Sequence, residues 1–220
     1  MKGLTSKVSG QRMVLVITVV ACALLFKGGY MQAKAHFAQF LIEQAWNDTL
    51  SHGGLNKPWS WADTYPIAKM QFMNSQHSVM GDALYILAGA SGRNLAFGPA
   101  AIMSNSQMNA WGNTVIAGHR DTHFARLKGI KPGQLISLQD SSSRERLYRV
   151  DTIAILAEDD TSLMGLHDEL QLTLVTCYPF ESLAAQSRWR FVVVAKPIKT
   201  EALADVAANA SLDRHDAISP

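Results

Sequence analysis

The stretch Thr173-Leu174-Val175-Thr176-Cys177 closes an apolar run over residues 171–177 and ends it in a cysteine. A short run rich in β-branched residues predicts a strand, so this thiol stands at a strand end. The chain has one other cysteine, Cys22, inside an apolar N-terminal segment where a disulfide with Cys177 is not expected. We therefore expect Cys177 to be free and treat it as a candidate nucleophile.

Similar strand-forming runs recur on both sides of this stretch. Turn signals rich in Gly, Pro, Asp and Ser separate them, and short helical pieces are expected only near residues 121–129 and 163–168. A closed or nearly closed barrel is the natural arrangement for so many short strands, so we predict an all-β domain. The predicted strands cover residues 65–72, 83–88, 113–118, 134–139, 146–157, 171–177 and 188–196.

The N-terminal segment has the order of an export signal or an anchor. Residues 13–26 carry no charge and follow Lys2, Lys7 and Arg12, and the stretch extends to residue 33, about 20 residues, which is close to a membrane span. We predict a cytoplasmic N-terminus over residues 1–12, a transmembrane helix over 13–33 and the remainder on the extracytoplasmic side of the cell membrane. Signal cleavage near residues 33–35, or at a lipoprotein-like box over 19–22, stays open.

The rest of the chain divides by composition. Residues 34–62 read as a juxtamembrane helix, with apolar residues at helical spacing over 35–46, and then a linker rich in Gly, Pro, Ser and Trp. Residues 63–198 form the predicted catalytic domain, and the Ala-rich tail over 199–220 is left as either a loose helix or disorder. The chain of 220 residues has a net charge of only +2 with scattered basic residues, so no nucleic-acid partner is expected.

A free thiol does chemistry only with a partner that removes its proton or stabilises the thiolate. His119 follows the strand-like run over 113–118, which ends in a glycine that allows close approach of another backbone or a ligand; the alternative is a surface-loop histidine. Arg188 and Arg190 open the last strand, where a guanidinium could hold an oxyanion. Strand alternation puts both arginines on one face, so spacing alone does not choose between them.

Three segments together resemble a known family. The stretches VIAGHRDTHF around His119, TLVTC over 173–177 and the closing WRFVVVAK resemble the signatures of sortases, which are membrane-anchored cysteine transpeptidases. The resemblance spans roughly residues 63–197, and GHRDTHF and TCYPF look most like the Gram-negative and class D-like groups. It implies an eight-stranded β-barrel in which His119, Cys177 and Arg190 match the catalytic residues. Arg190 is preferred to Arg188 because the family's arginine directly precedes the apolar core of the strand.

The resemblance also implies an activity. A sortase of this kind forms a Cys thioester with a protein that carries a C-terminal LPxTG-like sorting signal, and then transfers the acyl group to an amine acceptor. Thr176 matches a position whose backbone or hydroxyl helps to hold the oxyanion; its other interpretation is an ordinary strand residue. Both partners are attached to the membrane in such a system, which raises their effective concentration.

Other interpretations keep parts of this pattern. An exported cysteine peptidase would use water as acceptor, and an L,D-transpeptidase also uses Cys and His, although closer together in sequence. A non-catalytic anchored binding module would bury Cys177 as a small apolar side chain. His119 and His123 have the spacing of metal ligands, but no convincing third ligand accompanies them. The acidic residues 158–160 are interpreted as a solvated loop, although some sortases bind calcium nearby. No metal or cofactor is therefore expected.

Overall fold

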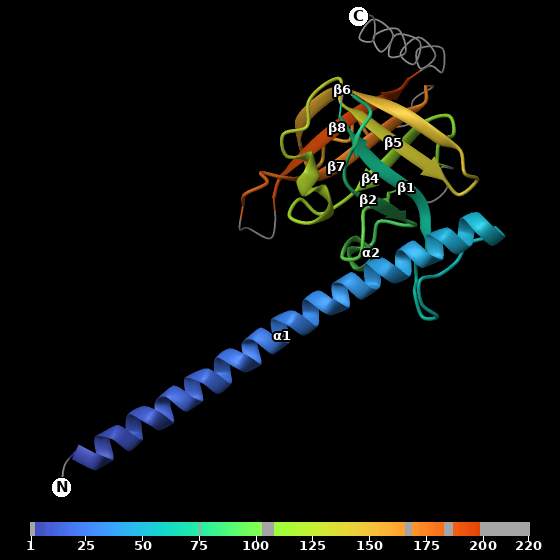
Figure 1. The fold of residues 1–220 in the computed structure, drawn as a ribbon. Helices are drawn as coiled ribbons and strands as arrows, with labels where there is room; N and C mark the ends of the chain where they lie inside the picture. Colours follow the sequence, from blue (N-terminus) through green and yellow to red (C-terminus); the bar gives the residue numbers. More distant parts are fainter. Residues whose placement is uncertain (1–2, 75, 103–107, 166–168, 183–186, 199–220) are drawn as a thin grey trace, which may run out of the picture. The chain divides into compact units, whose positions relative to one another are not determined.

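The computed structural model describes residues 3–74, 76–102, 108–165, 169–182 and 187–198 (Figure 1). The predicted tail over 199–220 and the end of the predicted helical piece over 163–168 lie outside the described residues. The chain divides into two compact units, Met1–Leu41 and a second one that begins at Ile42.

A single helix, α1 (Gly3–His52), contains both the predicted anchor and the predicted juxtamembrane helix. Within it, the stretch Arg12–His52 is long and apolar enough to cross a membrane, which makes it a candidate span. Its apolar side chains from Met13 to Phe26 are largely exposed, as expected of a helix whose surroundings are lipid rather than protein. Cys22 lies on this helix and is free.

The last turns of α1 pack within the second unit. Ile42 and Trp46 are each only 1% exposed, and Ile42 forms a buried cluster with Leu87 and Ala100. The Trp46 ring lies 6.5 Å from the ring of Tyr85. The compact unit therefore includes the C-terminal end of the helix, part of which belongs to the stretch over 35–46 that was predicted to be helical.

Eight strands within the described residues close into a barrel (Figure 1). Around the barrel the order is β1-β2-β3-β4-β7-β8-β6-β5, with β4 and β7 parallel and β7 and β8 antiparallel. The fold class is thus confirmed, and each predicted strand corresponds to an observed one. The strands are β1 (Pro66–Met73), β2 (Val79–Leu87), β3 (Ala100–Ala101), β4 (Asn113–Ala117), β5 (Leu135–Asp140), β6 (Glu145–Ala157), β7 (Gln171–Tyr178) and β8 (Trp189–Pro197).

Helical structure outside α1 is short. The helix α2 (Gly92–Leu95) begins with Ser91 as its N-cap, because the Ser91 hydroxyl accepts a hydrogen bond from the backbone N–H of Asn94. The 3₁₀ helix η1 (His123–Leu127) falls within the predicted piece over 121–129. Strand β3 has two residues, too few to produce an alternating sequence pattern, and was not predicted from the residues.

Both faces of β7 are covered, which explains why its sequence reads as continuous apolar rather than alternating. Leu172 and Leu174 point into the barrel interior, where the main core contains side chains from β1, β2 and β4 to β8. Val175 lies on the outer face with Val192 and Val194. Leu163 and Met164, from the segment between β6 and β7, pack over this outer patch.

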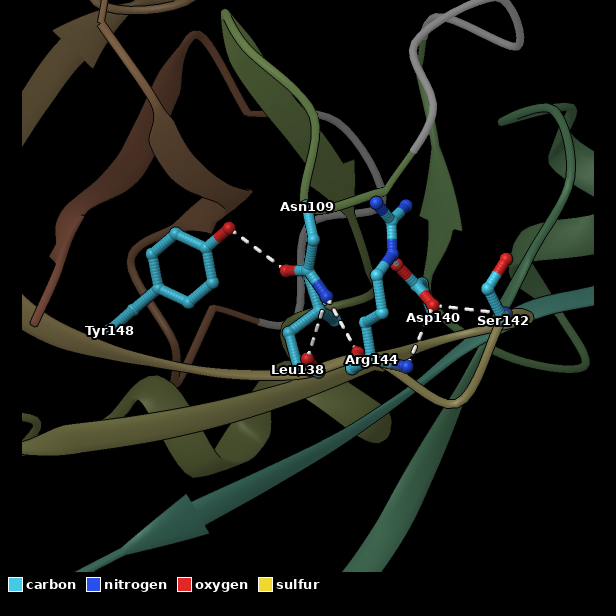
Figure 2. A network of polar contacts seen from close by, with 6 residues as sticks. All are labelled: Asn109, Leu138, Asp140, Ser142, Arg144 and Tyr148. Atoms are coloured by element: carbon cyan, nitrogen blue, oxygen red, sulfur yellow. Dashed lines mark hydrogen bonds and ion pairs between the residues drawn. The ribbon is translucent and has the colours of Figure 1, made fainter. Parts of the chain in front are cut away.

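A network of hydrogen bonds lies at the barrel end that carries the β5–β6 hairpin (Figure 2). The Tyr148 hydroxyl donates to Oδ1 of Asn109 at 3.0 Å, and Nδ2 of Asn109 donates to the carbonyl oxygens of Leu138 and Arg144. The Asp140 carboxylate accepts from Nε of Arg144 at 2.9 Å. Burial raises the pKa of Tyr148 well above its ordinary value, so the phenol stays protonated as a donor. The network gives the buried polar groups of this end their partners.

Candidate active site

Cys177 and Arg190 are paired residues on neighbouring strands. The antiparallel register of β7 and β8 sets Cys177 opposite Arg190, and such pairs have Cα atoms about 4.5–5.5 Å apart with side chains on the same face. Cys177 follows Val175 by two residues and Arg190 precedes Val192 by two, so both side chains continue the outer apolar patch. Cys177 is free and partly exposed, as predicted.

His119 lies just beyond the neighbouring strand β4. The parallel register of β4 and β7 pairs Ala117 with Val175, and the backbone N–H of Gly118 donates to the carbonyl oxygen of Val175 at 3.1 Å. The next residue, His119, is exposed. The ends of β4 and β7 therefore present the imidazole and the thiol at the same end of the barrel.

Thr176 joins these two strand ends through its side chain. Its hydroxyl donates to the carbonyl oxygen of Gly118 at 2.7 Å, and the residue is 2% exposed. A hydroxyl has one proton to donate, and here that proton is used within the protein. Thr176 therefore fixes the spacing of the residues that precede Cys177 and His119, and its hydroxyl proton is not available to an oxyanion.

Gly118 is required by packing rather than by its backbone conformation. A Cβ atom at residue 118 would lie 2.7 Å from Cγ of Phe124. Phe124 is completely buried on η1, and its backbone N–H donates to the carbonyl oxygen of His119 at 3.0 Å. The group that approaches this glycine is therefore the Phe124 ring, rather than the backbone or ligand that the sequence suggested, and the ring supports the turn that carries His119.

The guanidinium of Arg190 has three contacts. Its Nη1 donates to the carbonyl oxygens of Ser187 at 2.6 Å and of Trp189 at 3.1 Å, and its Nη2 forms an ion pair with Oε2 of Glu158 at 3.1 Å. The Arg190 side chain is 26% exposed and that of Glu158 is 52% exposed. Arg188 precedes β8, is exposed, and accepts a hydrogen bond from the backbone N–H of Glu158 through its carbonyl oxygen. The strand pairing thus brings Arg190, and not Arg188, opposite Cys177.

The segment after Cys177 is tied to the segment after His119. Arg120, 9% exposed, donates through Nη2 to the carbonyl oxygen of Ser182 at 3.0 Å. Lys128 pairs with the carboxylate of Glu181 at 2.5 Å and lowers the pKa of that group. A buried guanidinium without partners costs free energy. The buried Arg120 contact therefore constrains the two segments more than the exposed Lys128–Glu181 pair does.

Three aromatic side chains near Cys177 in the sequence and on the paired strand β8 pack against one another. Phe180 and Phe191 meet edge to face with ring centroids 5.1 Å apart, and Tyr178 stacks on Phe191 at 6.2 Å. Phe180 and Phe191 pack against the main core, so these rings cover the barrel interior at the end where Cys177 lies. The TCYPF sequence thus supplies both the thiol and two of the rings in this aromatic group.

His123 lies close enough to His119 for the two imidazoles to interact electrostatically. Burial lowers the pKa of His123, and Arg126 and His119 lower it further, so the neutral imidazole is favoured. Its Nδ1 lies 3.4 Å from the hydroxyl of Thr122. Within the described part of the chain, no group of three or more His, Cys, Asp and Glu side chains is arranged to hold a metal ion.

The structure combines a closed β-barrel with an accessible thiol, an imidazole at the neighbouring strand end and a guanidinium opposite the thiol. This combination defines the class of β-barrel cysteine enzymes. A family model described as a sortase domain matches residues 78–198, more than half of the chain. The chain belongs to the sortase family, whose members are cysteine transpeptidases.

Individual relatives agree with this assignment. Sortase D of Bacillus subtilis (strain 168) is 35% identical over 88 residues, which make up 40% of this chain and 43% of that protein, so the match spans less than half of the relative's length. A sortase D5 transpeptidase of Clostridium perfringens has the same fold, with a TM-score of 0.57 at 19% identity over 74% of this chain and 99% of that one. Sortase A of Listeria monocytogenes matches with a TM-score of 0.52 at 22% identity, covering 61% and 88% of the two chains.

Glu158 is the residue near this site that sequence reasoning did not select. It belongs to the acidic cluster over 158–160 that was interpreted as a solvated loop. Its exposure agrees with that interpretation, yet its carboxylate is paired with Arg190. A hint was present in its position directly after β6, but only the pairing of β6 with β8 brings it to the guanidinium.

Proposed function

We propose that this protein is a membrane-anchored cysteine transpeptidase that cleaves an LPxTG-like sorting signal through a thioester on Cys177 and transfers the acyl group to an amine. The observation that carries the proposal is the cross-strand pair of Cys177 and Arg190 next to the strand end that bears His119. Cys177 on β7 and Arg190 on β8 lie next to the end of β4, after which His119 follows, although the three residues are far apart in sequence.

Each residue has a distinct role in the proposed reaction. The Cys177 thiolate attacks the carbonyl carbon of the scissile peptide bond, and Arg190 stabilises the resulting oxyanion with a charge that needs no proton transfer. The carbon–nitrogen bond then breaks, and His119 as imidazolium gives its proton to the leaving amine. An incoming amine attacks the thioester, His119 takes its proton, and the Cys177 thiolate leaves.

The candidate membrane span supports the choice of substrate class. A sorting signal is held at the membrane by its own apolar segment, so enzyme and substrate attached to one surface meet at a high effective concentration. We place the barrel on the extracytoplasmic side, because the basic residues Lys2, Lys7 and Arg12 precede the apolar stretch. The identity to a sortase D supports a class D-like subtype, and the Gram-negative assignment rests on the motif sequences.

The experiment uses the full-length chain in detergent. It is incubated with an LPxTG-type peptide, with and without a triglycine acceptor, and intact-mass spectrometry follows the adduct on the protein. We expect a thioester on Cys177 that disappears when the acceptor is added, and no adduct in Cys177→Ala. Cys22→Ala is the matched control and should keep the thioester, because Cys22 lies on α1. An adduct that survives in Cys177→Ala contradicts the proposal.

The same assay separates transfer from hydrolysis. A transpeptidase gives the ligated product when the amine is present, whereas a cysteine peptidase releases the free carboxylic acid even with abundant amine. A binding module gives neither product. The partial exposure of Cys177 argues against a thiol that only fills the core.

A further inference from the structure

Glu158 lies on the same face as the candidate catalytic residues. Strand β8 lies between β6 and β7, and its Arg190 is paired with Leu156 on one side and with Cys177 on the other. Leu156 packs against the outer apolar patch, and Glu158, two residues later, follows on that face. The backbone of Glu158 is held there by the hydrogen bond from its N–H to the carbonyl oxygen of Arg188 at 2.8 Å.

The contacts that Arg190 makes with the described residues use part of its donors. A guanidinium has five N–H groups in a rigid plane. Nη1 faces the carbonyl oxygens of Ser187 and Trp189, and one donor of Nη2 faces Glu158. The two carbonyl contacts are both made by one nitrogen and hold that corner of the guanidinium. The Glu158 contact is on the second nitrogen and fixes the guanidinium at another point.

The ion pair is too exposed to be needed for the stability of the barrel. The Glu158 side chain is 52% exposed and that of Arg190 26%, and such partly exposed pairs contribute little to folding because water screens the charges. Removing the Glu158–Arg190 ion pair should therefore change the orientation of Arg190 and leave the stability of the fold unchanged. Variants at Glu158 can thus separate an effect on activity from an effect on stability.

We propose that Glu158 is a positioning residue that acts through Arg190, holding the guanidinium so that its remaining donors face the carbonyl oxygen of a substrate bound at Cys177. This inference rests on the proposed function and adds to it a residue outside the three that match the family signatures. The carboxylate does not touch the reacting atoms; its effect reaches them through the orientation of one side chain.

The test compares Glu158→Ala, which removes the acceptor, with Glu158→Gln, which keeps an oxygen acceptor but loses the charge. Asp159→Asn is the matched control, since it removes the same charge from the neighbouring exposed residue. With the full-length chain and an LPxTG-type peptide, we expect Glu158→Ala to lower kcat about tenfold, the size of one charge-assisted hydrogen bond, with KM changed less than about twofold. Glu158→Gln should lose about threefold, and Asp159→Asn should behave as wild type.

A double-mutant cycle shows whether Glu158 acts through Arg190. In an Arg190→Lys background, which lacks the planar fork, Glu158→Ala should add less than about a twofold loss. A full tenfold loss in that background, wild-type kcat in Glu158→Ala, or a loss that follows a lowered Tm would overturn the proposal.

A second readout does not depend on activity. The ¹⁵N relaxation of the Arg190 Nε–H, assigned by its loss in Arg190→Lys, should report an ordered guanidinium in wild type and a disordered one in Glu158→Ala. If wild type fails to process the peptide while this difference is present, the proposed function fails and the positioning role stands. If relaxation is the same in both proteins, the positioning role fails whatever the activity is.

Discussion

The hydroxyl of Thr176 donates to the carbonyl oxygen of Gly118 at 2.7 Å, and this bond joins the residue before Cys177 to the residue before His119. With the hydrogen bond from Gly118 N–H to Val175, it makes two adjacent crossings between the ends of β4 and β7. These two contacts, one from the Thr176 side chain and one between backbone groups, leave little freedom in the separation of the two strand ends. They therefore fix the backbone positions from which the thiol and the imidazole extend.

Replacing Thr176 by valine tests this relationship. Valine keeps the shape but removes the donor, so the buried Gly118 carbonyl loses a partner and the free energy of unfolding should fall by about 1–3 kcal/mol. Activity should fall more than in Thr176→Ser, which retains the hydroxyl. Chemical denaturation and peptide turnover measure the two effects. If Thr176→Val and Thr176→Ser are equally stable, the hydrogen bond makes no net contribution to the free energy of unfolding.

Replacing Gly118 by alanine should displace Phe124. The added methyl group would lie 2.7 Å from the ring, so either the ring or the turn after β4 has to move, at a cost of about 1–3 kcal/mol. We expect a lower Tm and a loss of activity, both partly restored by the second change Phe124→Leu. If alanine is tolerated with full activity, the packing explanation for this glycine is wrong.

The choice between the two arginines has a direct test. Arg190→Ala should lower kcat by a factor of about 10²–10³, as expected for the loss of an oxyanion donor. Arg188→Ala should stay within about twofold of wild type, because that side chain is exposed and lies before β8. Steady-state kinetics of both variants decides the assignment, and the opposite order of effects would transfer the role to Arg188.

The network at the far barrel end should affect stability without affecting chemistry. Tyr148→Phe removes the hydrogen bond to Asn109 and should cost about 1–3 kcal/mol, because Oδ1 of Asn109 stays buried without its donor. Tyr148 lies opposite Pro197 at one end of the β6–β8 pair, whereas Arg190 is at the other end. Denaturation should show the loss while kcat stays unchanged. A large fall in kcat would mean that the two ends are coupled.

His123 should make stability depend on pH. Its pKa in the folded state is below the ordinary value of about 6.5, so the unfolded state binds more protons in this range and stability falls as pH decreases below about 6.5. His123→Asn should flatten this part of the profile. Tm measured from pH 8 to pH 5 in both proteins tests the prediction, and parallel profiles would contradict it.

The sequence by itself determined the strands and the elements of the candidate site. Runs of β-branched residues bounded by turns identify strands locally, and a cysteine or histidine at a run's end is visible without a partner. The two-residue β3 was not visible, because two alanines carry no periodic signal. Gly118 indicated a close approach, but the ring that makes it, Phe124, belongs to a later turn.

Tertiary structure decided which side chains meet. Arg188 and Arg190 share a face by alternation, and only the register of β8 against β7 sets Arg190 opposite Cys177. Glu158 looked like one charge of a solvated loop until the pairing of β6 with β8 brought it to the guanidinium. Strand register depends on contacts between residues that are distant in sequence, so it cannot be read from a local stretch. The pattern of buried residues is a local property, so the sequence alone predicts the strands.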